Sequence, residues 1–450
     1  MIYRDLYKIL GKWKEDPANL PLILRGARQV GKTTLIKEFG KSYDQYLYFN
    51  LEKQDDAARF NNLKDLDQTI QLLFLSRAKE HTKGKKTLLF FDEVQERPEV
   101  IESLRYFKED HEHLDIIVSG SLLEFAFGKI SRIPVGRVQY LELHPLNFRE
   151  YLRGLGHQVG IDALNQAPLD NSLTSIFYKL FHQFTLVGGM PGIVSPFLDN
   201  DQDITTVNHL YASIIESYKQ DVEKYGSNDQ QRMIIRHIMD TAPFEIDNRV
   251  NLNHFGGSGF KTREVKEAMR ALENARVLEL IYPTTQTQPP IVSDLKKRPR
   301  LHYLDVGLVN YQLGMHQELL TIDDLHDSTR GKLMQQIVNQ EIKAQHSLPG
   351  HKRAFWVRES RGASAEVDIV FPYQNMLIPV EVKSGANGTL RSLHEYMDRC
   401  DHQYAIRIYK GKLSIDDMKS RTGKPYKLLN LPYFLSGWLR EYLDWFTDIH

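Results

Sequence analysis

Four short hydrophobic runs in the first 150 residues alternate with stretches of helical period. The runs are 20–24, 46–51, 87–91 and 115–120, and the amphipathic stretches between them include 63–77 and 98–108. Short hydrophobic runs bounded by polar turns are typical of parallel strands that are buried on both faces. The alternation therefore predicts a doubly wound α/β sheet.

The pattern changes twice further along the chain. Residues 171–240 have long segments of helical period, interrupted by the glycines and proline of 188–192, and predict a helical region. From residue 250 the elements become shorter and mixed. The expected order is helix 262–275, strand 277–282, helix 331–346, strands 353–358, 366–371 and 377–382, helix 390–400 and strand 403–409. The last part thus predicts a second α/β unit.

Length and composition limit the class of protein. A chain of 450 residues suggests several domains, and 41% hydrophobic residues suffice for packed cores. Lysine plus arginine equals aspartate plus glutamate, 58 against 58, so any basic surface must be local. The single cysteine, Cys400, excludes an intrachain disulfide, and no hydrophobic run is long enough to span a membrane. We expect a cytoplasmic protein without a membrane partner.

A phosphate-binding loop follows the first predicted strand. Its pattern is G-x-x-x-x-G-K-[ST], placed between a strand and a helix, which is the context that this loop requires. The loop places backbone N–H groups and a helix N-terminus around phosphates, with Lys32 as the cation and Thr33 as a magnesium ligand. ATP and Mg²⁺ are the predicted ligands. The predicted nucleotide-binding residues are Gly26, Ala27, Arg28, Gln29, Val30, Gly31, Lys32, Thr33 and Thr34.

Two carboxylates end the strand at 87–91. Asp92 is expected to contribute to the magnesium site, and Glu93 to polarise the attacking water. The next strand ends at Ser119, where a hydroxyl that senses the γ-phosphate would lie. Ser119 and Ser121 fit an ordinary turn equally well, and both interpretations remain open at this point.

These motifs carry a resemblance. GARQVGKTT, LLFFDEVQE, IIVSGSLLE and GRVQYLELHPLNFREYL resemble the AAA-type ATPases of bacteria and archaea that have a C-terminal domain of undefined function. LVGGMPGIV, LHYLDVGL, EVD and VEVKS extend the resemblance over nearly the whole chain. It implies an AAA+ core at 1–155 with strand order 5-1-4-3-2, a helical lid at 156–242, a winged-helix-like segment at 243–325 and a restriction-endonuclease-like α/β domain at 326–450. It also implies that Arg137 is a finger in cis or in trans within a homo-oligomer, although a plain surface arginine fits as well.

The last domain contains an arrangement typical of nucleases. Asp368 is followed thirteen residues later by Glu381-Val382-Lys383, which matches D…(D/E)-x-K, and the strand period places Glu381 and Lys383 on one face. Two carboxylates and a lysine suit a magnesium-assisted phosphodiester cleavage. Gln335 stands where the related proteins have a glutamate, and Glu341 is an uncertain replacement. We expect the three side chains to converge, to bind metal weakly and to cut slowly or not at all.

A basic segment precedes this domain. Between residues 249 and 300 there are ten lysines and arginines against five acidic residues. Lys261, Arg263 and Lys266 lie near the start of the helix at 262–275 and suit contacts with DNA phosphates, and a solvated helix face is the alternative.

The sequence thus predicts a magnesium-dependent AAA+ ATPase that couples ATP binding and hydrolysis to nucleic-acid binding, with nuclease activity that is weak or lost. The alternative is a nucleotide-controlled signalling or assembly switch without a DNA role. DNA-stimulated ATP hydrolysis would distinguish the two.

Overall fold

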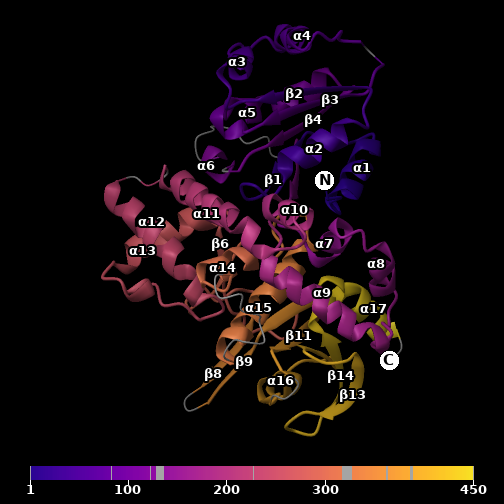
Figure 1. Cartoon of the computed structure of the whole chain (residues 1–450), viewed down its shortest axis with the longest axis vertical. Coiled ribbons are helices and arrows are strands. Elements are labelled where there is room, and N and C mark those ends of the chain that lie inside the picture. The colour runs from indigo at the N-terminus through magenta and orange to yellow at the C-terminus, as the bar shows by residue number, and fades with distance from the viewer. Residues whose placement is uncertain are drawn as a thin grey trace.

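The computed structural model describes residues 2–82, 84–121, 123–127, 136–224, 226, 228–316, 327–360, 363–385 and 389–448. In Figure 1 the N-terminal sheet lies at the top, the helical region in the middle and the C-terminal sheet at the bottom. One cluster of buried hydrophobic side chains runs through all three parts, from Leu6 to Phe446. The parts therefore share a continuous core.

The N-terminal sheet is parallel and five-stranded, in the order β2-β3-β4-β1-β5. This order is the one that the family resemblance implies. Its strands are β1 (Leu22–Arg25), β2 (Gln45–Asn50), β3 (Thr87–Asp92), β4 (Leu114–Ser119) and β5 (Gln139–Glu142). The four hydrophobic runs identified in the sequence form β1 to β4, which confirms the predicted α/β core. Strand β5 is shorter and half-exposed, and no hydrophobic run marks it.

Successive residues of the strands face opposite layers of helices. Leu89 and Phe91 of β3 pack in the cluster that contains α4 (Leu66–Ser76) and α5 (Glu99–Asp110). Leu88 and Phe90 pack in the cluster with α1 (Leu6–Glu15) and α2 (Lys32–Gly40). Because the side-chain period of a strand is two, a run without polar residues must be covered on both faces. The short helix α3 (Gln54–Ala57) follows β2, and the short helix α6 (Leu123–Phe127) packs through Leu123 in the cluster with α4 and α5.

Helices dominate the middle of the chain, as predicted. They are α7 (Phe148–Gly154), α8 (Gln158–Asn165), α9 (Thr174–Val187), α10 (Pro191–Asp199), α11 (Asn208–Glu223), α12 (Asp229–Thr241), α13 (Thr262–Asn274) and α14 (Val306–Gln312). Asp305 is fully buried and joins two of the motifs noted in the sequence, because it accepts hydrogen bonds from Gly189 N (2.7 Å) and Gly307 N (3.0 Å). A Cβ at Gly307 would lie 2.0 Å from the carbonyl oxygen of Val187, so only glycine permits this approach.

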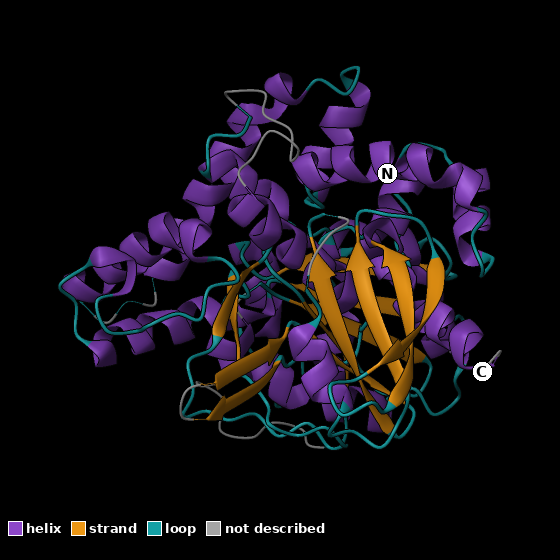
Figure 2. Cartoon of the chain, turned by 90° about the horizontal axis from the view of Figure 1, so that it is seen from below, coloured by secondary structure: helices purple, strands orange, loops and turns teal. Residues whose placement is uncertain are grey.

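The C-terminal part contains a mixed sheet in the order β10-β11-β12-β14-β13. Its strands are β10 (Ile369–Tyr373), β11 (Met376–Lys383), β12 (Tyr404–Tyr409), β13 (Ser414–Lys419) and β14 (Pro425–Pro432). Helix α15 (Asp327–Ala344) packs on one face, and α16 (Arg391–Met397) packs on the other. Figure 2 shows this sheet with its helices and the nearby two-stranded ribbon. The ribbon is β8 (Trp356–Ser360) and β9 (Ala363–Val367).

The remaining elements include several that the sequence pattern did not predict. Strand β6 (Leu278–Ile281) is the strand predicted at 277–282, and it pairs antiparallel with β7 (Arg300–Tyr303), which was not predicted. Strands β13 and β14 and helix α17 (Leu439–Asp448) are additional to the predicted elements. Across the described residues, no helix has the length and hydrophobicity needed to cross a membrane.

Candidate functional site

The loop between β1 and α2 has the backbone of a phosphate-binding loop. Gly31 caps α2 with φ at +96°, and Gly26 has φ at +153°. A Cβ at Gly26 would lie 2.5 Å from the carbonyl oxygen of Leu143. Both glycines are therefore required by the backbone, and the N-terminus of α2 points its free N–H groups toward the loop.

Lys32 is held inside this loop. Its ammonium group donates to the carbonyl oxygens of Gly26 and Ala27, both at 2.8 Å, and the residue is 6% exposed. Burial lowers the pKa of Lys32 to about 8, and the nearby carboxylates of Glu93 and Asp92 oppose this shift. Lys32 is thus a cation in a low-dielectric site, and the two acids stabilise its charge. An anionic ligand would stabilise that charge further.

Asp92 connects the loop to the neighbouring strands. Its carboxylate accepts a hydrogen bond from Thr33 Oγ1 at 2.7 Å and from Tyr48 OH at 3.3 Å, and its other oxygen is bound by Ser119 Oγ. Hydroxyl and carboxylate oxygens are the donors that Mg²⁺ prefers. Thr33 and Asp92 therefore supply the kind of oxygen atoms that a magnesium ion requires. In this structure the hydroxyl of Ser119 is a hydrogen-bond donor to Asp92.

Glu93 lies at the same edge of the sheet. It adopts the left-handed backbone conformation with φ at +54°, which is uncommon for a residue other than glycine. Its carboxylate accepts a hydrogen bond from Gln95 Nε2 at 2.7 Å. Burial raises the pKa of Glu93, while Gln95 and Lys32 oppose the shift. Gln95 positions Glu93, and no sequence motif had singled it out.

A cavity of about 490 Å³ opens over the loop. Its polar side contains Lys32, Thr33, Glu93 and Ser121. Its other side consists of residues from three parts of the chain that the sequence had not predicted at the nucleotide site: Ile2, Tyr3, Arg4, Tyr7, Leu146, Pro191, Gly192 and Ser195. The cavity therefore combines an anion-binding loop with a hydrophobic and aromatic wall, which suits a nucleotide.

Arg4 fixes the first residues of the chain over the loop. Its guanidinium donates to the carbonyl oxygens of Val30 (2.7 Å) and His144 (2.6 Å), and it forms an ion pair with Glu150 at 3.0 Å. Three segments that are distant in sequence thereby meet at one buried side chain, which places Tyr3 and Tyr7 beside the cavity.

The helical region contacts the loop through Arg28. Its guanidinium forms an ion pair with Asp221 of α11, and its carbonyl oxygen accepts a hydrogen bond from Tyr218 OH at 2.5 Å. The start of α10 contributes Pro191 and Gly192 to the cavity lining. Helix α10 thus lines the cavity itself, whereas α11 contacts it through Arg28, which is a lining residue.

Arg137 lies elsewhere. Its side chain is 56% exposed and forms an ion pair with Glu109 at 2.9 Å. In the described part of the chain, the residues that line the cavity do not include Arg137. A role in cis would need a different position of this side chain.

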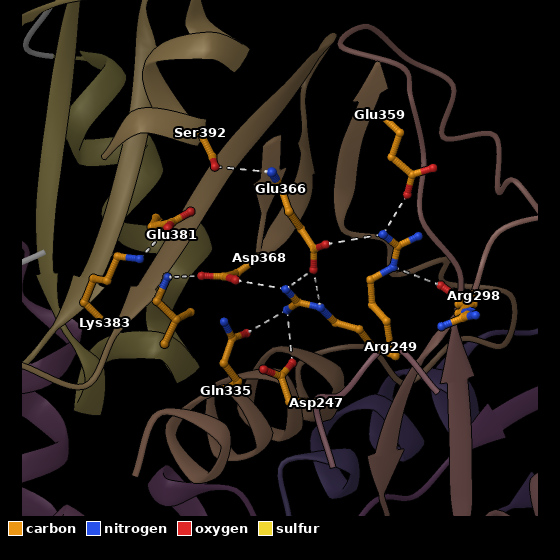
Figure 3. A network of polar contacts seen from close by, with 12 residues as sticks. Asp247, Arg249, Arg298, Gln335, Glu359, Glu366, Asp368, Glu381, Lys383 and Ser392 are labelled. Atoms are coloured by element: carbon orange, nitrogen blue, oxygen red, sulfur yellow. Dashed lines mark hydrogen bonds and ion pairs between the residues drawn. The ribbon is translucent and has the colours of Figure 1, made fainter. Parts of the chain in front are cut away.

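The three residues of the predicted C-terminal site do come together (Figure 3). Lys383 Nζ lies 2.6 Å from Glu381 Oε1, and Asp368 Oδ2 accepts from the backbone N–H of Val382 at 2.9 Å. Asp368 stands between β9 and β10, in a stretch that the sequence predicted as one strand at 366–371.

The surroundings of this site do not fit a metal ion. Asp368 Oδ1 pairs with the guanidinium of Arg300 at 3.2 Å, and Gln335 Oε1 lies 3.5 Å from the same guanidinium. Glu341 is not a replacement for the missing acid, because it accepts from the backbone N–H of Phe148 in α7. Among the residues that the structure describes, no group of three or more His, Cys, Asp or Glu side chains is arranged to hold a metal.

The three predicted DNA-contacting residues lie on the outside of α13. Lys261, Arg263 and Lys266 are exposed, and Arg263 forms an ion pair with Glu267 at 3.1 Å. The buried face of this helix is hydrophobic and packs against α12.

Comparison with protein families identifies the N-terminal part. Residues 18–152 match the AAA domain family. Residues 178–319 and 330–429 match two families described as domains of unknown function, DUF8612 and DUF4143. The chain therefore carries an AAA-type ATPase domain, followed by two regions whose families have no assigned activity.

Two curated relatives are themselves uncharacterized proteins. One, from Haemophilus influenzae, is 23% identical over 309 residues, which cover 65% of this chain and 69% of that protein. The other, MJ1544 from Methanocaldococcus jannaschii, is 25% identical over 222 residues, which cover 48% of this chain and 45% of that protein.

Solved structures show partial similarity. The Walker-type ATPase PABY2304 of Pyrococcus abyssi has a TM-score of 0.45 at 15% identity and covers 70% of this chain and 96% of its own. The Aeropyrum pernix ORC1 protein in complex with DNA has a TM-score of 0.29 at 14% identity and covers 70% and 92%. The signal-transduction ATPase PH0952 of Pyrococcus horikoshii has a TM-score of 0.27 at 11% identity and covers 76% and 48%. The domain assignment rests on the sheet order and the family match.

Proposed function

We propose that this chain is a magnesium-dependent ATPase whose nucleotide cycle controls the position of its helical region. The observation that supports this most strongly is the meeting of Lys32, Thr33 and Glu93 at one cavity, with Asp92 bonded to Thr33 behind it. A buried cation, two oxygen donors for a metal and a positioned carboxylate are the parts that phosphoryl transfer requires.

Each residue has a role in this proposal. Lys32 would exchange the loop carbonyls for the β- and γ-phosphates. Thr33 and Asp92 would hold Mg²⁺, which would neutralise charge on the phosphates. Glu93 orients the attacking water, and Gln95 keeps the Glu93 carboxylate in place. Arg28 transmits the state of the loop to α11 through Asp221.

DNA is the proposed partner of α13. Lys261, Arg263 and Lys266 form an exposed basic row on a helix whose opposite face is buried, which suits phosphate contacts. DNA binding at this row would be independent of sequence and sensitive to salt.

The alternative, a nucleotide-controlled switch without a DNA role, is favoured by one set of contacts. Arg249 and Lys297 pair with Glu359, and Arg276 pairs with Glu142 and Glu124. These basic residues join regions of the protein to one another, so the surface free for nucleic acid is smaller than the sequence count suggested. The C-terminal unit then serves assembly and does not cut.

Arg137 could act between the copies of a homo-oligomer in this proposal. Because its side chain is exposed and outside the lining of its own cavity, it suits a finger supplied to the cavity of a neighbouring copy. A decisive test is to mix Arg137→Ala subunits with Lys32→Ala subunits, since partial recovery of hydrolysis requires action in trans.

An ATP hydrolysis assay with and without duplex, single-stranded and branched DNA tests the main proposal. We expect hydrolysis that requires Mg²⁺ and is stimulated by DNA. A Lys261→Ala/Arg263→Ala/Lys266→Ala variant should lose the stimulation, and each replacement should reduce the salt slope of DNA binding by about one. Replacing the exposed Lys64, Lys79 and Lys85 of the ATPase domain with alanine is the matched control. Mg²⁺-dependent hydrolysis whose rate is the same with and without each DNA would favour the nucleotide-controlled switch without a DNA role.

A further inference from the structure

Four acidic side chains gather where the middle of the chain meets the C-terminal sheet. Glu366 and Asp368 come from the region of β9 and β10, Glu381 comes from β11, and Asp247 comes from the segment before α13. Like charges this close need a counter-charge, because a buried carboxylate without one is costly.

The guanidinium of Arg300 contacts three of these four acids. Nε donates to Glu366 Oε1 at 2.8 Å, Nη1 to Asp247 Oδ1 at 3.0 Å and Nη2 to Asp368 Oδ1 at 3.2 Å. The side chain is 10% exposed, and its guanidinium carbon lies 4.8 Å from the ring centre of Phe355. Every nitrogen of the guanidinium therefore has an acidic partner, and water has little access.

Arg300 leaves no room for a second cation on Asp368. One carboxylate oxygen of Asp368 faces Arg300, and the other accepts the backbone N–H of Val382. Glu381 is turned toward Lys383 through Oε1, and its buried Oε2 has no hydrogen-bond partner within the described residues. Apart from Glu381 Oε2, the oxygen atoms of Asp368 and Glu381 are thus divided between Arg300, Lys383 and a backbone amide.

Two other basic residues, Arg249 and Lys297, lie at the edge of the cluster. Arg249 pairs with Glu359 at 2.7 Å and lies 3.8 Å from Glu366, and Lys297 pairs with Glu359 at 2.6 Å. Arg249 therefore lies on the same side of the cluster as Arg300 and has the same charge, but it does not contact Asp368.

We propose that Arg300 occupies the place of a divalent cation in this acidic cluster. The cluster is then an ion-pair clamp that joins β7 to the C-terminal sheet, and it becomes a divalent-cation site only when the guanidinium is removed. The inference does not depend on ATP hydrolysis, because the residues involved lie outside the cavity over the phosphate-binding loop.

Removal of Arg300 provides the test, with Mn²⁺ as the probe. Binding is measured by electron paramagnetic resonance on the nucleotide-free full chain in an Asp92→Asn background, so that the N-terminal site contributes no metal. Arg300→Ala should bind Mn²⁺ at least about tenfold more tightly than the parent, because it leaves carboxylate oxygens without a cation. Adding Asp368→Asn should abolish the gain, and Arg249→Ala should not produce it.

Thermal unfolding gives a second reading of the same change. Arg300→Ala should melt at a lower temperature than the parent, and Mn²⁺ should restore part of the loss, because a ligand that binds only the folded state stabilises it. If Arg300→Ala does not fold, Arg300→Lys tests the same point, since a lysine reaches fewer of the acids and should give an intermediate gain in Mn²⁺ affinity. The inference is overturned if the parent protein binds Mn²⁺ through Asp368, or if neither Arg300 variant gains affinity.

Discussion

The chemistry of the ATPase domain depends on a few side chains whose neighbours set their properties. Lys32 is a buried cation that rests on the carbonyl oxygens of its own loop, and Glu93 is kept in place by Gln95. In the proposed roles, Lys32 contacts the phosphates and Glu93 orients the attacking water, so ATP binding and ATP hydrolysis should be separable.

Lys32→Ala should abolish ATP binding, whereas Glu93→Gln should bind ATP normally and hydrolyse it about 10²- to 10⁴-fold more slowly, the usual cost of losing a general base. Equilibrium binding of a fluorescent ATP analogue and phosphate release measure the two effects. Gln95→Ala should lower the turnover rate less than Glu93→Gln and leave affinity unchanged. Wild-type turnover in Glu93→Gln would contradict the assignment.

Gln335 gives a second prediction for a single residue. Gln335 stands where the related proteins have a glutamate, but its Oε1 lies 3.5 Å from the guanidinium of Arg300. Gln335→Glu should therefore add another acid to the Arg300 clamp and leave Mn²⁺ affinity unchanged. A raised Mn²⁺ affinity in this variant, measured by electron paramagnetic resonance, would show that a metal ion can displace the Arg300 guanidinium.

At the scale of elements, the proposed route from the nucleotide to the helical region is the contact between the phosphate-binding loop and α11. The route consists of one ion pair and one hydrogen bond, Arg28 to Asp221 and Tyr218 to the Arg28 carbonyl. Because Asp221 is nearly buried and Arg28 is partly exposed, the pair is worth more than an ordinary surface contact.

Asp221→Asn should weaken ATP binding several-fold and remove the ATP-dependent protection of α11 in hydrogen exchange. The reason is that the loop would no longer be tied to the helix. Asp240→Asn, which removes an exposed partner of Lys219 on the same helix, is the control and should leave both properties unchanged. Equal ATP-dependent protection in the two variants would argue against this route.

At the scale of the whole molecule, buried polar contacts join the ATPase domain to the C-terminal part. Glu341 of α15 is fully buried and accepts the backbone N–H of Phe148 at the start of α7 at 3.0 Å. Burial, together with the charge of Glu150, raises the pKa of Glu341 to about 8. Glu341 therefore favours the folded state while it is protonated.

The stability of the protein should depend on pH through this residue. A glutamate that titrates at about 4.3 when unfolded and at about 8 when folded contributes fully below the first value and loses its contribution as the pH rises through the second. Glu341→Gln keeps an acceptor for Phe148 without the titration. Its melting temperature should fall less between pH 5 and 8, as measured by calorimetry, and should exceed that of the wild type above pH 8. Glu441→Gln, which removes an exposed partner of Arg149, should follow the wild type.

The sequence by itself determined the parts of this protein that depend on neighbouring residues. Strand, glycine loop and helix at 22–40, and the carboxylates that end β3, are local patterns, because backbone geometry and side-chain period are set within a few residues. The additional strands β13 and β14 have no comparable local pattern in the sequence, because the elements packed around them decide which of their residues are buried.

Only the tertiary structure decided which distant residues meet. Tyr3 and Tyr7 lie beside the nucleotide cavity because Arg4 is tied to Val30 and His144. Arg300 belongs to a basic run that resembles a DNA-contacting surface, yet packing turns it inward onto acids from 247, 366 and 368. The physical reason is that a buried charge is stable only where opposite charges converge, and that convergence is a property of the assembled fold.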